Sequence, residues 1–453
     1  MPVLAEIPLG TIATQGRWDA EYFQPAYLSI ATTLDSDQNP HLGTLAHLTC
    51  SAFYPSATEY YQDNGIPFIR CVDVNNYPVI QSDQPFERLP EKFLRQHKSI
   101  RSAQSGDIII SKVGSPCFTS ILDESVREAA LTRTVLALKK VRTDKVNPYY
   151  LVVFLRSKYG FSQLLREREQ QIQFQLTLDR VKKIRIFLPP RKLQDEIGSL
   201  IKEYGNVLTH SKNSYFSAQQ MLEKELGLDK IDLSHGIGYD TCLSEVLSAR
   251  RWDAQCFYPV YLRYAEAVRK HSRFDSISQL VYPPVKGVQQ DDAESGDTAY
   301  ASIKHVSDFE MLTDASASSI VAGSKVAKPG DLLLAITGAT IGKVGIVSRY
   351  DQLAFSGDLL QLRVREGLDP HYLLVVLRSP IGQGQLLRWV TGSTNGHLAP
   401  RDVMQALIPR LGKKEQIISD KVRKALSARK QAEELLEQAK HRVEEMIEAG
   451  TGR

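Results

Sequence analysis

Two long stretches of the chain carry apolar residues at alternating steps of about four and three, while Glu, Lys and Gln fill most other positions. In the first stretch the apolar residues are Leu193, Ile197, Leu200, Tyr204, Val207, Tyr215, Ala218 and Leu222. In the second they are Ile418, Val422, Ala425, Ala432, Leu436, Ala439, Val443 and Met446, with Arg429 interrupting the series once. This spacing keeps one apolar seam of a helix facing a partner. The pattern therefore predicts two long amphipathic helices.

Proline and glycine mark the expected ends of these helices. Pro189-Pro190 and Pro409 precede them, the first ends near Gly227, and the second ends just before Gly450. Each would run about 30–35 residues, or roughly 45–50 Å at 1.5 Å per residue. Neither helix can bury so long a seam alone, so we expect the two to pack on each other. The alternative is that each helix lies over the core of its own domain.

The regions before each helix mix short apolar runs with turns. Residues 107–110 and 331–334 each follow a glycine and are typical of buried strands, whereas 149–155 and 372–377 are dense enough for buried helices. Many short strands with a few helices indicate the α+β class. The expected organisation is a first domain over residues 1–190, a spacer helix over 191–230, a second domain over 231–410 and a spacer helix over 411–453.

The two halves of the chain repeat each other. RWDAEYFQPAYL at residues 17–28 and RWDAQCFYPVYL at residues 251–262 are identical at eight of twelve positions, at an offset of 234. The Ile69-Arg70 pair matches Ile303-Lys304 at the same offset. Such internal repetition indicates two copies of one scaffold.

Two further blocks continue the repeat in the same order. SGDIIISKVG at residues 105–114 matches PGDLLLAITG at an offset of 224, and NPYYLVVFLRS at residues 147–157 matches DPHYLLVVLRS at an offset of 222. The falling offset means that the halves share a frame but differ in the segments between the matched blocks. Two domains that bind different halves of a split site would need this arrangement. Duplication of a stable domain for any other purpose would also leave the same frame.

Composition and charge exclude several classes of protein. The 453 residues carry a net charge of only +4, which neither requires nor excludes nucleic acid. The five cysteines form no CxxC pair and are expected to be reduced thiols without a metal. With neither a signal peptide nor an apolar stretch near the ~18 residues that span a bilayer, the expected localisation is cytoplasmic.

Sequence motifs of catalysis are incomplete. GATIGKV at residues 338–344 has three residues between its glycines and Val after its lysine, where a phosphate-binding loop needs four and a Ser or Thr. NPYY at residues 147–150 is similar to a methyltransferase tetrapeptide, but a helix start explains it and its counterpart DPHY. HExxH and GxSxG motifs are absent. We therefore expect no cofactor and no catalysis by this chain.

Taken together and in order, the blocks resemble the specificity subunits of type I restriction-modification enzymes. The resemblance rests on Pro55-Ser56, Glu59-Tyr60 and GIPFIRCVDV, on the Gly-Asp-strand blocks, and on LPP or IP before each long helix. It implies two target-recognition domains that read an asymmetric, split site in double-stranded DNA. It further implies that the long helices form an antiparallel coiled coil that sets the spacing. Two methyltransferase (modification) subunits and the motor-nuclease restriction subunits would dock on this non-catalytic body. The second half departs from the pattern at residues 282–297, which puts the position of its recognition loop in doubt.

Polar residues beside the matched blocks are the candidate DNA contacts, because these side chains bind base edges and phosphates. The segment QIQFQ at residues 171–175 occupies the place of GSTNGH at residues 392–397, and the two are unalike. The candidates are Arg70, Lys112, Gln173, Gln175, Lys304, Thr337, Lys343 and Asn395. The candidate coiled-coil residues are Leu193, Ile197, Leu200, Tyr204, Ile418, Val422, Leu436 and Val443. Any single candidate also fits an ordinary solvated residue. Two alternatives stay open for the chain: a coiled-coil scaffold without DNA specificity, or a nuclease or methyltransferase with an unrecognised active site.

Overall fold

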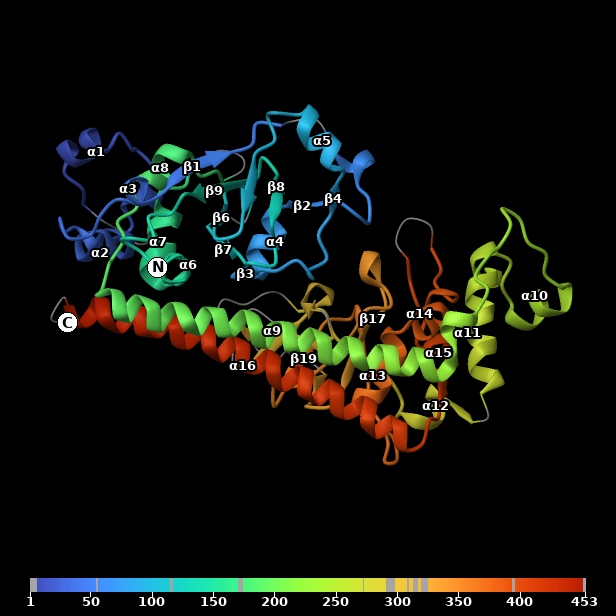
Figure 1. Cartoon of the computed structure of the whole chain (residues 1–453). Helices are drawn as coiled ribbons and strands as arrows, with labels where there is room; N and C mark the ends of the chain where they lie inside the picture. Colours follow the sequence, from blue (N-terminus) through green and yellow to red (C-terminus); the bar gives the residue numbers. More distant parts are fainter. Residues whose placement is uncertain are drawn as a thin grey trace. The chain divides into compact units, whose positions relative to one another are not determined.

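The computed structural model describes residues 6–53, 56–114, 117–169, 174–271, 273–290, 298–307, 309–312, 317–318, 325–392 and 396–450. The chain divides into two compact units: Met1–Leu208 with Lys430–Arg453 form unit 1, and Thr209–Arg429 form unit 2. Two long helices, α9 (Arg191–Leu226) and α16 (Lys413–Gly450), each contribute residues to both units (Figure 1). Among the described helices, none is both long and apolar enough to cross a membrane.

Unit 1 contains two mixed sheets with the strand orders β1-β9-β6-β7-β3 and β4-β2-β8-β5. The strands are β1 (His47–Cys50), β2 (Ile66–Ile69), β3 (Val79–Ile80), β4 (Arg88–Leu89), β5 (Ser102–Gln104), β6 (Ile108–Ser111), β7 (Thr119–Leu122), β8 (Glu128–Leu131) and β9 (Val135–Lys139). β6 is central because Ile109 pairs antiparallel with both Ser120 and Ala137, and its isoleucines are fully buried. Gly106, at φ +82°, makes the turn that enters this strand.

Helices pack around these sheets. They are α1 (Leu9–Gln15), α2 (Pro25–Leu34), α3 (Leu42–Leu45), α4 (Cys71–Asn76), α5 (Glu91–Gln96), α6 (Pro148–Arg156), α7 (Lys158–Arg166) and α8 (Leu178–Lys182), with 3₁₀ turns at Ala20–Phe23 and Thr58–Tyr60. α6 is the buried helix that its apolar run predicts: Tyr150 to Leu155 are all buried, and Asn147 caps its first turn. The Tyr150 hydroxyl donates to Phe187 O at 2.7 Å, which fixes the segment leading into α9.

Unit 2 repeats the strand order of both sheets of unit 1 and adds β13 at one edge of its larger sheet. Its sheets have the orders β11-β20-β17-β18-β14-β13 and β15-β12-β19-β16, and a short ribbon pairs β10 with β21. The strands are β10 (Phe274–Ser276), β11 (Val285–Lys286), β12 (Thr298–Ala301), β13 (Val306–Ser307), β14 (Glu310–Met311), β15 (Ala317–Ser318), β16 (Val326–Ala327), β17 (Leu332–Ala335), β18 (Val344–Ile346), β19 (Leu353–Phe355), β20 (Leu359–Leu362) and β21 (Leu407–Pro409). Leu332 stands 224 residues after Ile108, so β17 takes the central place of β6.

The helices of unit 2 follow the same order. They are α10 (Leu243–Ala249), α11 (Pro259–Lys270), α12 (Ile277–Leu280), α13 (Pro370–Arg378), α14 (Pro380–Leu387) and α15 (Pro400–Val403), with 3₁₀ turns at Leu228–Lys230, Ala254–Phe257, Ile303–His305 and Gly338–Thr340. The contacts repeat as well as the elements. The Tyr372 hydroxyl donates to Pro409 O at 2.6 Å, as Tyr150 does to Phe187 in unit 1. The repeated blocks of the sequence are therefore the blocks that build the common frame.

Within unit 2 the second half of α9 packs antiparallel on the first half of α16. The Ser211 hydroxyl donates to Ala425 O at 2.7 Å, Lys421 Nζ donates to the Ser217 hydroxyl at 2.8 Å, and Lys414 pairs with Glu225. The residue numbers of these three pairs add to 636, 638 and 639. A nearly constant sum is the signature of antiparallel neighbours. Within unit 1, the last turns of α16 contact α7, where the Lys158 amide donates to Glu444 Oε1 at 2.6 Å.

The buried seam of α9 differs by one position from the predicted one near the start of the helix. Along this seam Gln194, Ile197, Ile201, Tyr204, Leu208, Ser211, Tyr215, Ala218 and Leu222 are buried, an unbroken alternation of three and four, and the predicted Val207 is buried beside them. Leu193 and Leu200 are half-buried beside this seam. On α16, Ile418, Val422 and Val443 are fully buried, whereas Leu436 is half-buried.

Candidate nucleic-acid interface

In unit 1 the predicted recognition residues gather where β6 ends. Val113 forms a β-bridge with Gln175, which also bridges Glu169, and the Leu176 amide donates to Lys112 O at 2.9 Å. Cys71, the neighbour of Arg70, donates its thiol to Val113 O at 3.3 Å. Three segments far apart in the sequence therefore meet. We call the group Arg70, Lys112, Val113, Glu169 and Gln175 loop cluster 1; Gln173 lies outside the described residues.

Unit 2 builds the same cluster with different side chains. Thr337 forms a β-bridge with His397, which also bridges Thr391, and the Leu398 amide donates to Ile336 O at 2.9 Å. The side chain of Ile303, next to Lys304, lies 3.7 Å from the position of a Cβ on Gly338. Lys343 faces Ala335 across the following hairpin, its carbonyl accepting from the Ala335 amide at 2.9 Å. The group Lys304, Thr337, Lys343, Thr391 and His397 is loop cluster 2; Asn395 lies outside the described residues.

The backbone frame of the two clusters is the same, whereas their side chains differ. Val113, Gln175 and Glu169 become Thr337, His397 and Thr391 at offsets of 224, 222 and 222. These offsets equal those of the neighbouring sequence blocks, so the bridges belong to the duplicated scaffold. A reader of DNA requires this combination, because the frame fixes the position and the side chains provide the hydrogen-bonding pattern.

Ion pairs and exposure divide the predicted side chains into two groups. Arg70 pairs with Asp73 at 3.3 Å and Glu87 at 3.2 Å, and the Thr337 hydroxyl donates to Asp358 Oδ1 at 2.7 Å. Both side chains thus have partners within the protein, and a ligand would have to compete with them. Lys304 and Lys343 are exposed, and Lys112 and Gln175 are half-buried.

The base of loop cluster 1 contains further charged groups that the sequence analysis did not single out. Arg180 lies 3.6 Å from both Glu167 and Glu169, and the Arg168 guanidinium stacks over the Phe174 ring at 4.4 Å. Burial raises the pKa of the Glu167 carboxyl above its usual value, although Arg180 opposes this shift. Stacked Arg and aromatic side chains of this kind bind nucleic-acid bases in many proteins.

An arginine that is buried in unit 1 and partly buried in unit 2 holds each cluster in place, and the sequence analysis assigned it no role. Arg17, only 6% exposed, pairs with Asp19 at 2.6 Å and donates to Arg168 O at 2.7 Å, next to Glu169. In unit 2, Arg251 pairs with Asp253 at 2.6 Å and donates to the carbonyls of Trp389 and Val390 at 3.1 Å each.

The available signal was the Arg-x-Asp spacing repeated at an offset of 234. A guanidinium group donates several hydrogen bonds at once, so an arginine beside a carboxylate can hold the backbone of a neighbouring loop in place.

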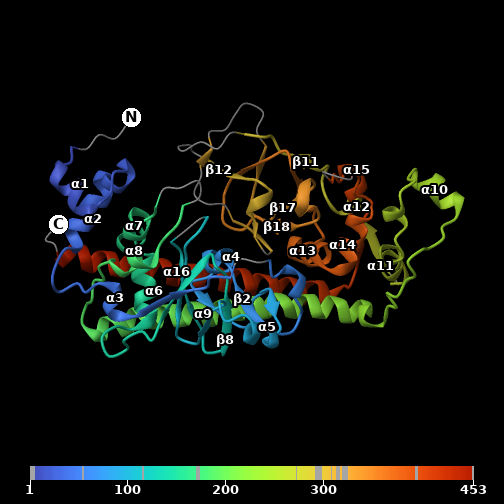
Figure 2. The same cartoon turned by 90° about the horizontal axis from the view of Figure 1, so that it is seen from above.

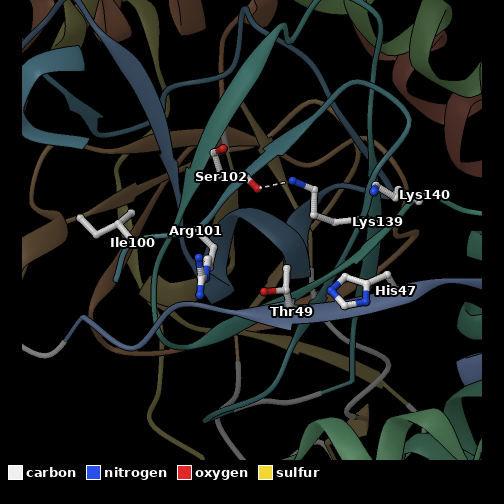
Figure 3. A pocket seen from close by; sticks show the side chains of 7 residues that line it. All are labelled: His47, Thr49, Ile100, Arg101, Ser102, Lys139 and Lys140. Carbon is white, nitrogen blue, oxygen red and sulfur yellow. Dashed lines mark hydrogen bonds between the residues drawn. The ribbon is translucent and has the colours of Figure 1, made fainter. Parts of the chain in front are cut away.

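A second basic surface of unit 1 lies at the opposite end of the β6–β9 pair from Lys112. Here a pocket of about 480 Å³ is lined by His47, Thr49, Ile100, Arg101, Ser102, Lys139 and Lys140 (Figure 3). Lys139 Nζ donates to Ser102 O at 2.9 Å and lies 4.0 Å from Asp107, whose pKa is raised by burial. Arg101 and Lys140 are exposed, so the pocket could hold an anion such as a phosphate. The counterpart of Lys139 in unit 2 is Arg363, which pairs with Asp331 at 2.7 Å.

Within the described residues, no three His, Cys, Asp or Glu side chains form a group that could hold a metal ion. The candidate site is therefore a polar and partly basic surface on a rigid α/β frame. A surface of this kind binds a ligand through hydrogen bonds and charge.

Comparison with known proteins places this frame in a family. Residues 41–214 match the family model of the type I restriction modification DNA specificity domain. The match begins before β1, runs through both sheets and loop cluster 1, and ends within α9. These residues are thus a domain of that family, and the family resemblance of the sequence is confirmed.

Solved structures of restriction-modification proteins match the chain with low identity, two subunits over most of its length and one endonuclease over less than half. The S subunit of a type I system from M. genitalium matches with 10% identity and a TM-score of 0.39, covering 90% of this chain and 94% of that one. The HsdS subunit from Thermoanaerobacter tengcongensis matches with 16% identity and a TM-score of 0.27, covering 88% and 94%. The type IIG restriction endonuclease BpuSI matches over 43% of this chain and 30% of its own, with 9% identity and a TM-score of 0.31. No curated protein sequence matches the chain.

Proposed function

We propose that the chain is the non-catalytic DNA-recognition subunit of a type I restriction-modification complex. It reads one part of a split, asymmetric site in double-stranded DNA with loop cluster 1 and the other part with loop cluster 2. The observation that carries this proposal is the repetition of one bridged frame with different side chains, Val113 and Gln175 in one unit and Thr337 and His397 in the other. The family match over residues 41–214 supports it for unit 1, and the common strand order supports its extension to unit 2.

The long helices act as the spacer in this proposal. The antiparallel pairing seen between Ser211 and Ala425 continues along both helices as a coiled coil and holds the two domains at a fixed distance. When one of two rigidly connected domains binds its half-site, the other domain is held at a high effective concentration near the second half-site. This gain in affinity occurs only when the distance between the half-sites matches the spacing of the domains. The modification and restriction subunits, which carry the chemistry, dock on this body.

A binding experiment on the full chain tests the proposal. DNA sequences that bind the purified chain are selected from a randomised duplex pool and sequenced. We expect a site of two short elements separated by a gap. Lys112→Ala or Gln175→Ala should relax the preference for bases in one element only, and Lys343→Ala in the other only. A contact with a base contributes about 1–3 kcal/mol to the preference for that base over the others. Loss of a contact with a phosphate lowers the slope of log affinity against log salt concentration by about one.

The matched control is Lys270→Ala, which removes an exposed lysine, paired with Glu266 at 2.9 Å, from outside both clusters. This variant should select the wild-type site. Binding without sequence preference, or no binding that weakens with salt, would favour the scaffold interpretation. Turnover or S-adenosylmethionine binding by the isolated chain would favour the enzyme interpretation.

A further inference from the structure

Each unit exposes one tryptophan at the same place in the repeat. Trp18 is 76% exposed and Trp252 is 77% exposed, and they are 234 residues apart. Trp is the residue most enriched among side chains that dominate protein–protein binding energy, and most tryptophans are largely buried. An exposed tryptophan in one unit needs no explanation. Two at equivalent positions with equal exposure are a property of the duplicated frame.

Both tryptophans are rigidly mounted. Arg17 and Asp19 flank Trp18 and hold each other at 2.6 Å, and Arg251 and Asp253 do the same beside Trp252. Arg17 and Arg251 also donate to backbone carbonyls of their units, as described above. The ring therefore projects from a fixed backbone, which reduces the conformational entropy lost when a partner binds it.

An exposed leucine accompanies each tryptophan at the same offset. Leu9 is 70% exposed at the start of α1, and Leu243 is 62% exposed at the start of α10. α1 contains no buried residue at all, so its own unit does not explain why it carries apolar side chains. Figure 1 and Figure 2 show α1 projecting from the body of unit 1, and α10 projecting from the body of unit 2.

The net charge of the segments that carry these tryptophans does not favour DNA as the occupant. Residues 6–21 contain one basic residue, Arg17, and three acidic ones, so their net charge is 1 − 3 = −2. The equivalent residues 240–255 contain two basic and three acidic residues, so their net charge is 2 − 3 = −1. A surface that binds the phosphate backbone has to be basic. An apolar centre with an acidic rim instead fits a protein that offers an apolar pocket edged by Lys or Arg.

We propose that Trp18 with Leu9, and Trp252 with Leu243, are two equivalent docking points for two copies of one partner protein. The loop clusters differ between the units because they read different bases, whereas these surfaces are alike because both meet the same protein. This inference rests on the proposed function in one respect: it takes the partner to be the modification subunit of the complex. Each docking point lies beside a loop cluster, since Arg17 and Arg251 connect the two, so a bound partner reaches the DNA element that its unit reads.

The stoichiometry of the complex tests this inference. The purified full chain is titrated with its cognate modification subunit, and the number of bound copies is measured by native mass spectrometry. We expect two copies on the wild-type chain. Trp18→Ala or Trp252→Ala should leave one copy bound with wild-type affinity and weaken the other at least tenfold, and the double variant should lose both. Trp18→Phe should restore most of the affinity, because an aromatic ring still fills the pocket.

Two controls separate docking from folding and from DNA contact. Tyr60→Ala removes another aromatic side chain, 49% exposed, and should leave two copies of the partner bound. The tryptophan variants should unfold at the wild-type temperature and bind DNA as the wild type does. Unchanged stoichiometry, an effect at only one tryptophan, a wild-type complex with a single copy, or a loss of DNA affinity in place of subunit affinity would each overturn the inference. If the wild-type chain binds two subunits through its tryptophans but no specific DNA, the proposed function fails and the docking points stand.

Discussion

A single carboxylate at the start of α13 ties the stability of unit 2 to pH. Asp369 accepts hydrogen bonds from the His371 amide at 2.9 Å and from His371 Nδ1 at 2.8 Å, and it pairs with Arg423 of α16. Burial alone would raise the pKa of Asp369, but the contacts with His371 and Arg423 outweigh it and lower the pKa to about 2. The equivalent cap in unit 1 is Asn147, which cannot ionise.

This difference predicts a stabilisation of unit 2 that acid removes. Because the folded pKa of Asp369 is lower than the unfolded one, the stabilisation is complete above about pH 4 and is lost as the pH falls toward about 2. Its size at neutral pH is about 2 kcal/mol. Asp369→Asn, which copies the cap of unit 1, should unfold more easily at pH 6 and approach the wild type at pH 2 in urea titrations. A constant difference between the two proteins at both pH values would contradict the assignment.

The buried Arg17 should control both the stability of unit 1 and the order of loop cluster 1. Arg17→Ala leaves Asp19 and the carbonyl of Arg168 without their donor, and we expect a loss of about 2–4 kcal/mol in unfolding free energy. Arg17→Lys keeps the charge but loses the fork of donors, so it should recover only part of that loss. Amide exchange should speed up over residues 174–176, because the base of loop cluster 1 is no longer held.

The control for this prediction is Arg142→Ala, since Arg142 is about half exposed in its pair with Asp144 at 2.9 Å. It should leave both stability and amide exchange unchanged, as exposed pairs usually do. Equal effects of the two substitutions would show that Arg17 acts only as a surface charge.

At the residue scale, the sequence indicated where candidate side chains lie in the chain but not which side chains they contact in the fold. Arg70, Lys112 and Gln175, which the sequence named as candidate DNA contacts, belong to segments that meet in loop cluster 1. The partners of Arg70 were not predictable, because Asp73 is adjacent only through the turn into α4 and Glu87 only through the pairing of β2 with β4. Hydrogen bonds of this kind depend on tertiary structure. Whether these side chains contact DNA stays a prediction.

At the scale of elements, apolar spacing predicted the helices and missed one detail of their packing. α9 begins directly after Pro190 and ends directly before Gly227, as predicted, whereas α16 begins at Lys413, four residues after Pro409, and includes Gly450. The runs at 149–155 and 372–377 are buried helices. The start of the α9 seam was misplaced because Gln194 is polar, yet only 3% exposed. Its side chain donates to Pro189 O at 2.8 Å and accepts from the Asn147 amide at 2.9 Å. These two bonds satisfy the buried amide, and nothing in the local sequence indicates them.

The sheets were less predictable than the helices. Strands of two to five residues carry little periodic signal, and their neighbours are distant in sequence, as in the pairing of β1 with β9. The glycine-led runs at 107–110 and 331–334 were recognisable because they are buried on both faces. The order of the remaining strands follows from contacts that only the folded chain makes.

Two neighbouring isoleucines test the seam between α9 and α16. Ile418 is fully buried in the core of unit 2, whereas Ile417 is 47% exposed. Ile418→Ala should cost about 2–5 kcal/mol, because it removes apolar contacts and leaves a cavity. Ile417→Ala has the same composition change and should cost less than about 1 kcal/mol. Urea unfolding of both variants gives the comparison, and similar losses would mean that the seam runs along a different face.

At the scale of the whole molecule, the proposed function explains why the sequence contains two copies of one domain, each followed by a long helix. The equivalent strands of the two units have the same order. Under the proposed function, a new specificity in either unit therefore needs changes only in its loop cluster. Nothing in the frame itself selects a base. Under the proposed function, the helices then set the one quantity that neither unit can determine alone, which is the number of base pairs between the two elements of the site.

A matched pair of insertions tests this role. The sums of paired residue numbers, close to 638, place the partner of Leu200 near residue 438 if the antiparallel register continues along both helices. Seven helical residues inserted after Leu200, together with seven after residue 438, preserve the alternation of three and four. They lengthen the pair by about 10 Å at 1.5 Å per residue, close to three base pairs.

We expect the insertion variant to select the same two DNA elements as the wild type, separated by a gap about three base pairs longer. Sequencing of DNA bound from a randomised pool measures both quantities at once. Insertion into α9 alone is the control: it leaves one helix unmatched, so it should lower the unfolding free energy and abolish a defined gap. An unchanged gap in the double-insertion variant, or altered bases in either element, would mean that the helices do not determine the spacing.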